Sequence, residues 1–224
     1  MMKRMLFWLL GLLCVTSMSA QDMKTVFLSM PDSITPLLTK VNKEDCIDFL
    51  ANDMKAEVKN RFGNVTEMKM LTDDYVYLQM TSQSAMELKL LPMNDSVKVV
   101  CMVKTVCGPA CDSEVHFFSS DWKQELPAAD FCQMPKVDEF FLTPETASPE
   151  FQDLRKRANM ELMKVSLAAD EASLTVLCTV PDYLNKEDRK KMEAYIKKEP
   201  ITFRWENGKF ITNKGPHQCC SPLF

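Results

Sequence analysis

Residues 66–106 read TEMKMLTDDYVYLQMTSQSAMELKLLPMNDSVKVVCMVKTV, and apolar side chains recur at every second position along most of this stretch. A period of two is typical of β-strands, whose successive side chains point to opposite faces. Polar turn residues interrupt the pattern at 72–74, 81–84 and 92–96. The stretch therefore predicts four antiparallel strands, and residues 114–119 add a fifth. The short connections indicate a meander with one face on a helix.

The segment before these strands predicts one amphipathic helix after an irregular start. Residues 23–40 contain prolines and show no period, so we expect them to drape over other elements. Asn42 can then cap a helix, with Asp45 three residues later. Apolar residues continue this helix at spacings of three and four toward Gly63: Ile47, Leu50, Met54 and Val58. The other side of the helix is charged, so one face should cover a core.

The segment after the strands predicts a second group of elements. Residues 121–148 are rich in proline and lack a period, which predicts a long connection. The dipeptide Ser148-Pro149 suits the N-cap and first position of a helix. A helical stripe follows it: Phe151, Leu154, Ala158, Leu162 and Val165. A strand at 173–180, a charged helix after Asn185 and a hairpin through the dipeptide Asn207-Gly208 come next.

Together these elements predict an α+β fold, with one or more antiparallel sheets packed against a few amphipathic helices. The expected order is α-βββββ followed by α-β-α-ββ. We expect an N-terminal α+β lobe with the meander at 21–120, a Pro-rich connection at 121–148 and a C-terminal α+β lobe at 149–224. The alternative is that the two lobes form one continuous domain.

Residues 1–20 have the pattern of a cleavable secretory signal peptide. Lys3 and Arg4 precede an apolar run at 5–15, and a short, mostly polar stretch leads to Ala20. This run is too short for a membrane-spanning helix, which needs roughly 20 residues. We therefore expect an exported protein that does not span a membrane and that works in the periplasm, at the cell surface or outside the cell.

The charge of the chain argues against two classes of partner. The formal net charge is −4, and loss of Lys3 and Arg4 with the leader makes it −6. No basic block is present in the sequence. We therefore expect neither a nucleic acid nor an anionic membrane surface as the partner.

Eight cysteines remain after removal of the leader, and eight thiols allow 105 pairings. Cys107 and Cys111 flank a predicted turn between two strands, which makes them a candidate disulfide. The alternative is a redox-active pair. Thiol oxidoreductases, however, place two residues between their cysteines at a helix N-terminus, where the thiol pKa falls. The longer spacing in a predicted hairpin favours a structural link or free thiols.

No residue is predicted to be catalytic or to bind a cofactor or a metal. His116 and His217 are the only histidines, and His116 should point from a strand to solvent or toward a second face. Neighbouring carboxylates such as Asp73-Asp74 and Glu187-Asp188 suit a turn or a helix cap. The sequence motifs of zinc proteases, serine hydrolases and phosphate-binding loops are absent.

Seventeen methionines are an unusual number for this length. Because methionine is flexible and polarizable, a cluster on one sheet face could form an adaptable apolar groove. The alternative is that the methionines fill a core. A methionine-rich face covered by the Pro-rich connection would favour a scaffold, and an open face would favour binding.

Several short stretches resemble a family of secreted Bacteroidales proteins of unknown function, the domain-of-unknown-function 3256 type. They are MPDSITPLLT at 30–39, CIDFL at 46–50, LTDDYV at 71–76, LLP at 90–92, VCGPACDS at 106–113 and FRWENGKF at 203–210. The resemblance implies a bacterial exported protein and brings no activity or active site. It also implies that sequences of Asp, Ser and an aliphatic residue could carry O-linked sugar, at Ser33 or Ser96.

The function favoured by the sequence is that of a non-enzymatic envelope protein that binds a protein or lipid partner through a sheet face or groove. An enzyme of an unrecognised type is the alternative, and its most definite form is a thiol-dependent activity at Cys107 and Cys111. A carrier of an apolar ligand is a third interpretation.

Overall fold

Two antiparallel sheets form the frame of the structure, a computed structural model that describes residues 21–142 and 148–212. The first sheet holds its strands in sequence order: β1 Ala56–Lys59, β2 Val65–Leu71, β3 Tyr75–Thr81, β4 Ser84–Pro92, β5 Lys98–Cys107, β6 Cys111–Ser119 and β7 Glu125–Leu126. The second sheet has the order β11-β10-β9-β8: β8 Met163–Leu167, β9 Ser173–Cys178, β10 Ile201–Glu206 and β11 Lys209–Thr212. The predicted α+β class with antiparallel sheets is confirmed.

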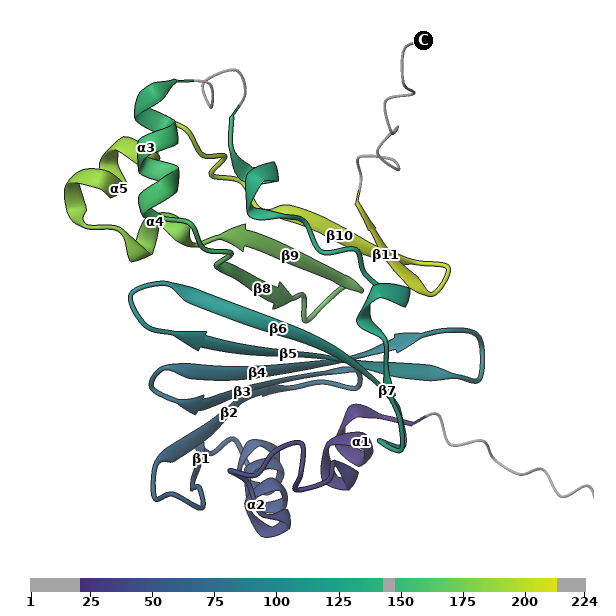
Figure 1. The fold of residues 1–224 in the computed structure, drawn as a ribbon. Coiled ribbons are helices and arrows are strands. Elements are labelled where there is room, and N and C mark those ends of the chain that lie inside the picture. The colour runs from purple at the N-terminus through teal and green to yellow at the C-terminus, as the bar shows by residue number, and fades with distance from the viewer. Residues whose placement is uncertain (1–20, 143–147, 213–224) are drawn as a thin grey trace, which may run out of the picture.

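The elements stack in layers (Figure 1). Helices α1 Met23–Ser29 and α2 Lys40–Ala51 lie on one side of the first sheet, and the second sheet lies on the other. The remaining helices are α3 Pro149–Arg157, α4 Val180–Tyr183, α5 Lys186–Met192 and the short 3-10 helices η1 Ala128–Asp130 and η2 Val137–Phe140. Because both faces of the first sheet are covered, every β4 residue from 86 to 91 is buried.

Two apolar cores fill the spaces between these layers. One lies between α1, α2 and the first sheet, and it includes Phe27, Leu38, Met68, Leu78 and Leu88. The other lies between the two sheets, and it includes Cys101, Phe117, Leu154, Val165 and Phe203. The second core contains residues on both sides of the Pro-rich connection at 121–148. The division into two lobes stays a prediction.

The prediction of an irregular start is wrong for residues 23–29, which form α1. Asp22 caps this helix by accepting a bond from the Thr25 amide at 2.8 Å. Trp122 Nε1 donates to the Val26 carbonyl at 2.8 Å and ties the helix to the sheet. A helix of two turns contains too few residues to show a period, and tertiary contacts hold it in place.

The predicted helix at 42–63 is correct only in its first half. Helix α2 begins one turn earlier, because Thr39 and Asn42 form the capping box that was expected of Asn42 and Asp45. It ends at Ala51, and Asp53 then adopts a left-handed backbone with φ of 55°. Residues 56–59 form β1 instead of a helical turn.

A similar error affects the helix predicted from Ser148 onward. Ser148 caps α3 and Pro149 occupies its first turn, as expected, but the helix ends at Arg157. Val165 belongs to β8, where it is fully buried. The predicted hairpin is confirmed, since Asn207 and Gly208 have φ of 50° and 79° between β10 and β11.

The interpretation of the methionines as an open groove is wrong for the four that lie beneath α1 and α2, whereas Met70 and Met93 are 44% and 39% exposed. Met68, Met80, Met86 and Met102 are at most 5% exposed and pack in the core beneath α1 and α2. The helices cover this face, not the Pro-rich connection. The alternative interpretation, that these methionines fill a core, is the correct one.

Candidate functional site

Strand β8 is the end strand of the second sheet, and the edge that does not pair with β9 lies against the first sheet. Its inner edge pairs with β9, so its other amides need acceptors from elsewhere. Side-chain oxygens of the first sheet supply them: Met163 N–H donates to Asp112 Oδ1 at 3.2 Å, Val165 N–H to Ser113 Oγ at 3.0 Å and Leu167 N–H to Glu87 Oε2 at 2.9 Å. We call these three bonds the β8 seam. The seam gives the edge strand partners without a further strand.

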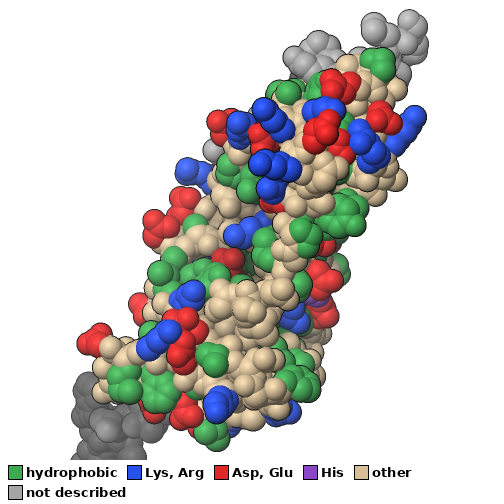
Figure 2. Space-filling model, turned by 90° about the vertical axis from the view of Figure 1, so that its left-hand side faces the viewer, with side chains coloured by type: hydrophobic (Ala, Val, Ile, Leu, Met, Phe, Trp, Pro, Cys, Tyr) green, Lys and Arg blue, Asp and Glu red, His purple; other side chains and the backbone are tan. Residues whose placement is uncertain are grey.

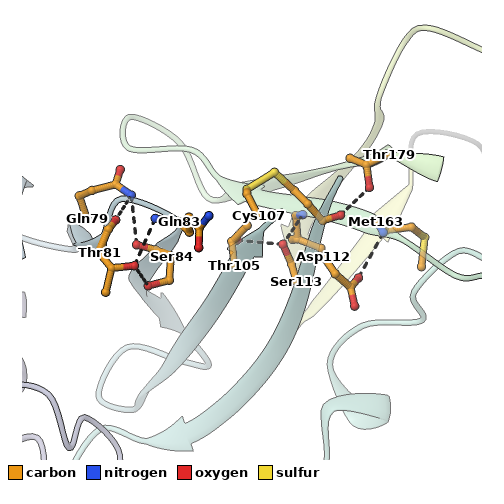
Figure 3. Close-up of a disulfide and its surroundings, with 12 residues drawn as sticks. Gln79, Thr81, Gln83, Ser84, Thr105, Cys107, Asp112, Ser113, Met163 and Thr179 are labelled. Atoms are coloured by element: carbon orange, nitrogen blue, oxygen red, sulfur yellow. Dashed lines mark hydrogen bonds between the residues drawn. A yellow bond between two sulfur atoms is a disulfide. The ribbon is translucent and has the colours of Figure 1, made fainter. Parts of the chain in front are cut away.

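The turn between β5 and β6 forms one end of this seam (Figure 3). A disulfide joins Cys107 to Cys111, whose Cα atoms are 4.0 Å apart. The Cys111 carbonyl accepts a bond from the Thr179 hydroxyl just after β9, and the Cys107 amide donates to the Gln83 carbonyl at 2.8 Å. The disulfide turn therefore contacts both the β3–β4 turn and the second sheet.

A cleft of about 430 Å³ lies between the β3–β4 turn and β8. Its lining residues are mostly of polar types, although polar and apolar atoms contribute equally to its surface: Tyr75, Tyr77, Gln79, Ser82, Gln83, Ser84, Ala85, Glu87, Thr105, Cys107, Lys164, Ser166 and Leu167. Figure 2 shows the side of the molecule on which these turns lie, where apolar side chains form small, separate patches. The cleft therefore offers several hydrogen-bonding side chains to a small ligand.

Glu87 is the buried charged group of the cleft. It is 5% exposed, and its Oε2 atom accepts bonds from the Leu167 amide and, at 2.9 Å, from the Tyr75 hydroxyl. Burial raises the pKa of the Glu87 carboxyl, although both bonds and the charge of Lys164 act in the opposite direction. Burial also raises the pKa of Tyr75, so that the phenol keeps its proton and donates.

Several polar groups that line the cleft have no partner among the described residues. Within 21–142 and 148–212, no hydrogen bond or ion pair is made by the side chains of Gln83, Lys164 and Ser166. The same holds for the Oε1 atom of Glu87, whose two bonds both go to Oε2. Glu87 and Lys164 carry opposite charges and line the same cleft without pairing directly. A ligand with donors and acceptors can use these groups without breaking existing bonds.

Glu87 predicts a specific pH dependence of stability. Because the pKa of its carboxyl is higher in the folded than in the unfolded chain, its stabilising contribution is complete below the unfolded pKa and is lost as pH rises through the folded pKa. Glu87→Gln keeps an acceptor for Leu167 and does not titrate. We expect the stability of this variant relative to wild type to increase as pH rises from about 4 to about 8.

Urea unfolding at a series of pH values measures this difference. The exposed residue Glu199 provides the matched control, and Glu199→Gln should show no such rise relative to wild type. A stability difference between Glu87→Gln and wild type that stays constant over the pH range would contradict the prediction.

The unpaired cysteines of the described residues are poor candidates for a thiol enzyme. Cys46, Cys101, Cys132 and Cys178 are all buried. Burial raises the pKa of Cys46 to about 11 and that of Cys132 to about 12, and it raises those of Cys101 and Cys178 as well. Such thiols stay protonated at neutral pH and react slowly as nucleophiles.

The other residues singled out from the sequence lie apart from the cleft. Ser33 and Ser96 are exposed in turns of the chain, and their glycosylation stays a prediction. His116 lies on β6, where its Nδ1 atom is 2.8 Å from Glu125 Oε1. Asp74 pairs with Lys89, and Asp188 pairs with Arg157, so both carboxylates have structural partners.

Charged side chains of both signs gather over α3 and α5, as Figure 2 shows. Arg157 pairs with Asp153 and Asp188, and Lys191 pairs with Glu187. This surface is therefore mixed in sign.

Neither a metal-binding cluster nor a membrane-spanning helix is found in the described residues. No cluster of three or more His, Cys, Asp or Glu side chains suited to a metal is found there. No helix in 21–142 or 148–212 is long and apolar enough to cross a bilayer. The predicted signal peptide at 1–20, His217 and two of the eight remaining cysteines, Cys219 and Cys220, lie outside the described residues.

Comparisons with known proteins agree with the resemblance noted in the sequence. The sequence model described as "Protein of unknown function (DUF3256)" matches residues 15–210. A solved domain of an uncharacterized protein from Porphyromonas gingivalis W83 is similar in structure, with a TM-score of 0.76 and 25% identity. The alignment covers 86% of this chain and 100% of that one. No match is found among curated proteins.

Proposed function

Since this chain belongs to the DUF3256 family of proteins of unknown function, we propose a role from its own geometry: it is an exported, non-enzymatic binding protein for a small zwitterionic ligand. The class of ligand is that of a free amino acid or a short peptide. The observation that carries the proposal is the pair of opposite charges, Glu87 and Lys164, that line one polar cleft without bonding to each other.

Glu87 and Lys164 would each bind one end of the ligand. A ligand ammonium group would lie at the free oxygen of Glu87, where it would lower the cost of keeping this buried carboxylate charged. A ligand carboxylate would lie at Lys164, on the wall formed by β8. The hydroxyl of Ser166 and the amide of Gln83 would bond the backbone or side-chain groups between the two ends.

Keeping a carboxylate at position 87 is costly for a purely structural bond. A neutral amide could accept from Leu167 without the cost of burying a charge. Perturbed titratable groups in a cleft are typical of functional sites. The buried carboxylate of Glu87 therefore supports a role for its negative charge in binding, in addition to its hydrogen bond in the β8 seam.

Other features of the chain support the remaining parts of the proposal. The leader at 1–20 supports export. The hydrogen-bonding side chains of the cleft and the filled methionine core favour a polar ligand over a lipid. The high pKa values of the unpaired cysteines favour binding over thiol catalysis.

Binding can be tested with a thermal-shift screen of free amino acids and dipeptides, followed by calorimetric titration of the best ligand. We expect wild-type protein to bind at least one of these ligands, because binding to the folded state alone raises its stability. N-acetylation of the ligand or the change Glu87→Gln should each weaken binding by about tenfold or more. Amidation of the ligand carboxylate or the change Lys164→Ala should do the same at the other end.

Combining the ligand and protein changes shows which end meets which residue. The N-acetylated ligand should be insensitive to Glu87→Gln, and the amidated ligand should be insensitive to Lys164→Ala. Lys156→Ala is the matched control, because Lys156 is an exposed lysine of α3 away from the cleft. Absence of binding by every amino acid and dipeptide, or binding that neither cleft variant weakens, would refute the proposal.

A further inference from the structure

The disulfide turn lies beside the cleft, next to the residues that bind β8. Cys107 and Cys111 are the paired end residues of β5 and β6, and both are partly exposed. Asp112 and Ser113, which follow directly, accept two of the three bonds of the β8 seam. The turn therefore lies next to the part of the first sheet to which β8 is attached, and Figure 3 shows Asp112 bonded to Met163 beside the disulfide.

We propose that the Cys107–Cys111 disulfide is a redox-controlled clamp that holds β8 on the first sheet. While the bond is intact, the short ring fixes the backbone at Cys111 and thereby the directions of the Asp112 and Ser113 acceptors. When it is reduced, the turn gains freedom and the β8 amides lose well-placed acceptors. The clamp concerns the seam itself, so it does not depend on the proposed ligand.

The reductant of the proposed reaction is an external dithiol. Its thiolate attacks one cysteine sulfur, forms a mixed disulfide and expels the other cysteine as a thiolate, which takes up a proton. The second thiol of the reagent then attacks the mixed disulfide and releases the remaining cysteine. Two electrons pass to the protein, which ends with two thiols, and the reagent leaves as a disulfide.

The burial of the other cysteines makes the switch selective. Cys46 and Cys101 are fully buried, and Cys132 and Cys178 are 6% and 7% exposed. The disulfide, by contrast, lies in a turn whose Gly108 and Pro109 are exposed. A dithiol can therefore reach this bond in the folded protein while the described free thiols stay protected.

The effect of reduction should be local. The β5–β6 ladder continues from the turn to the pair Val99 and Ser119, so the first sheet keeps its own backbone bonds. Helix α2 packs on β1 and β2, at the far side of that sheet. We therefore expect the change at β8 and not at α2.

Amide hydrogen exchange measured by mass spectrometry tests the clamp in three forms of the full mature chain. These are the oxidised wild type, the wild type reduced with dithiothreitol and alkylated, and the variant with Cys107→Ser and Cys111→Ser. In both open forms, the amides of Met163 and Val165 should exchange roughly tenfold faster than in the oxidised form, while α2 stays unchanged. Ser113→Ala with the disulfide intact should reproduce the faster exchange of Val165.

Two results would overturn the proposal. Unchanged exchange at β8 in both open forms would show that the disulfide does not hold the seam. Equal acceleration at β8 and α2 would show a general loss of stability and no local clamp. If the double serine variant does not fold, the alkylated wild type serves as the open form. Circular dichroism checks that this form is folded.

Discussion

Glu87→Ala is expected to lower the free energy of unfolding by about 3 kcal/mol at neutral pH, because it removes the shared acceptor of two buried donors. The Leu167 amide and the Tyr75 hydroxyl both donate to Glu87 Oε2 and lie in buried surroundings. A buried donor left without an acceptor costs about 1–3 kcal/mol. Urea unfolding followed by tryptophan fluorescence measures this loss.

Glu87→Gln separates the acceptor from the charge. The amide oxygen of the glutamine can replace Oε2, so this variant should be at least as stable as wild type at neutral pH. If both variants lose the same stability, the two hydrogen bonds are not the reason for the loss. If Glu87→Ala is as stable as wild type, the β8 seam does not need Glu87.

The strands from β2 to β6 could be predicted because each carries its own signal. Their apolar residues keep a period of two, and the turns between them consist of polar residues that favour turns. The β10–β11 hairpin is clear for the same reason, since Asn207 and Gly208 adopt the left-handed backbone that such a turn requires. In these elements, local preference and tertiary packing agree.

The short elements next to helices could not be predicted, because their apolar spacing fits two periods. Val58 lies four residues after Met54, which suits a helix, and two residues after Ala56, which suits a strand. The structure places Val58 in β1 and leaves Met54 55% exposed. Val165 in β8 presents the same ambiguity. The choice between helix and strand is made by packing against distant residues.

The candidate cleft was also hidden in the sequence. Glu87 and Lys89 alternate with apolar neighbours on β4, which is the pattern of a strand with one face in water. The second sheet covers that face, so both charges are buried. Their partners Leu167 and Ala169 lie 80 residues away in the chain. Contacts between residues so far apart in the chain leave no periodic pattern in the local sequence.

Lys89 is the second residue whose replacement should strongly lower the free energy of unfolding. Its side chain is 1% exposed, and its Nζ atom lies 3.0 Å from Asp74 Oδ2 and 3.0 Å from the Ala169 carbonyl in the β8–β9 turn. The ammonium group also lies 5.7 Å from the centre of the Tyr75 ring. Lys89 therefore joins the two sheets near Glu87.

Lys89→Ala should lower the free energy of unfolding by about 3 kcal/mol, because it leaves a cavity beside Tyr75 and removes both polar contacts. Lys89→Met keeps a chain of similar volume and removes the charge together with the contacts to Asp74 and the Ala169 carbonyl. Asp74 is 45% exposed, so water can replace the ammonium group at its carboxylate. We therefore expect Lys89→Met to lose only about 1 kcal/mol, as measured by the same urea titration. Equal losses in the two variants would show that the polar contacts of the ammonium group, and not the packing of the lysine chain, hold the sheets together at this point.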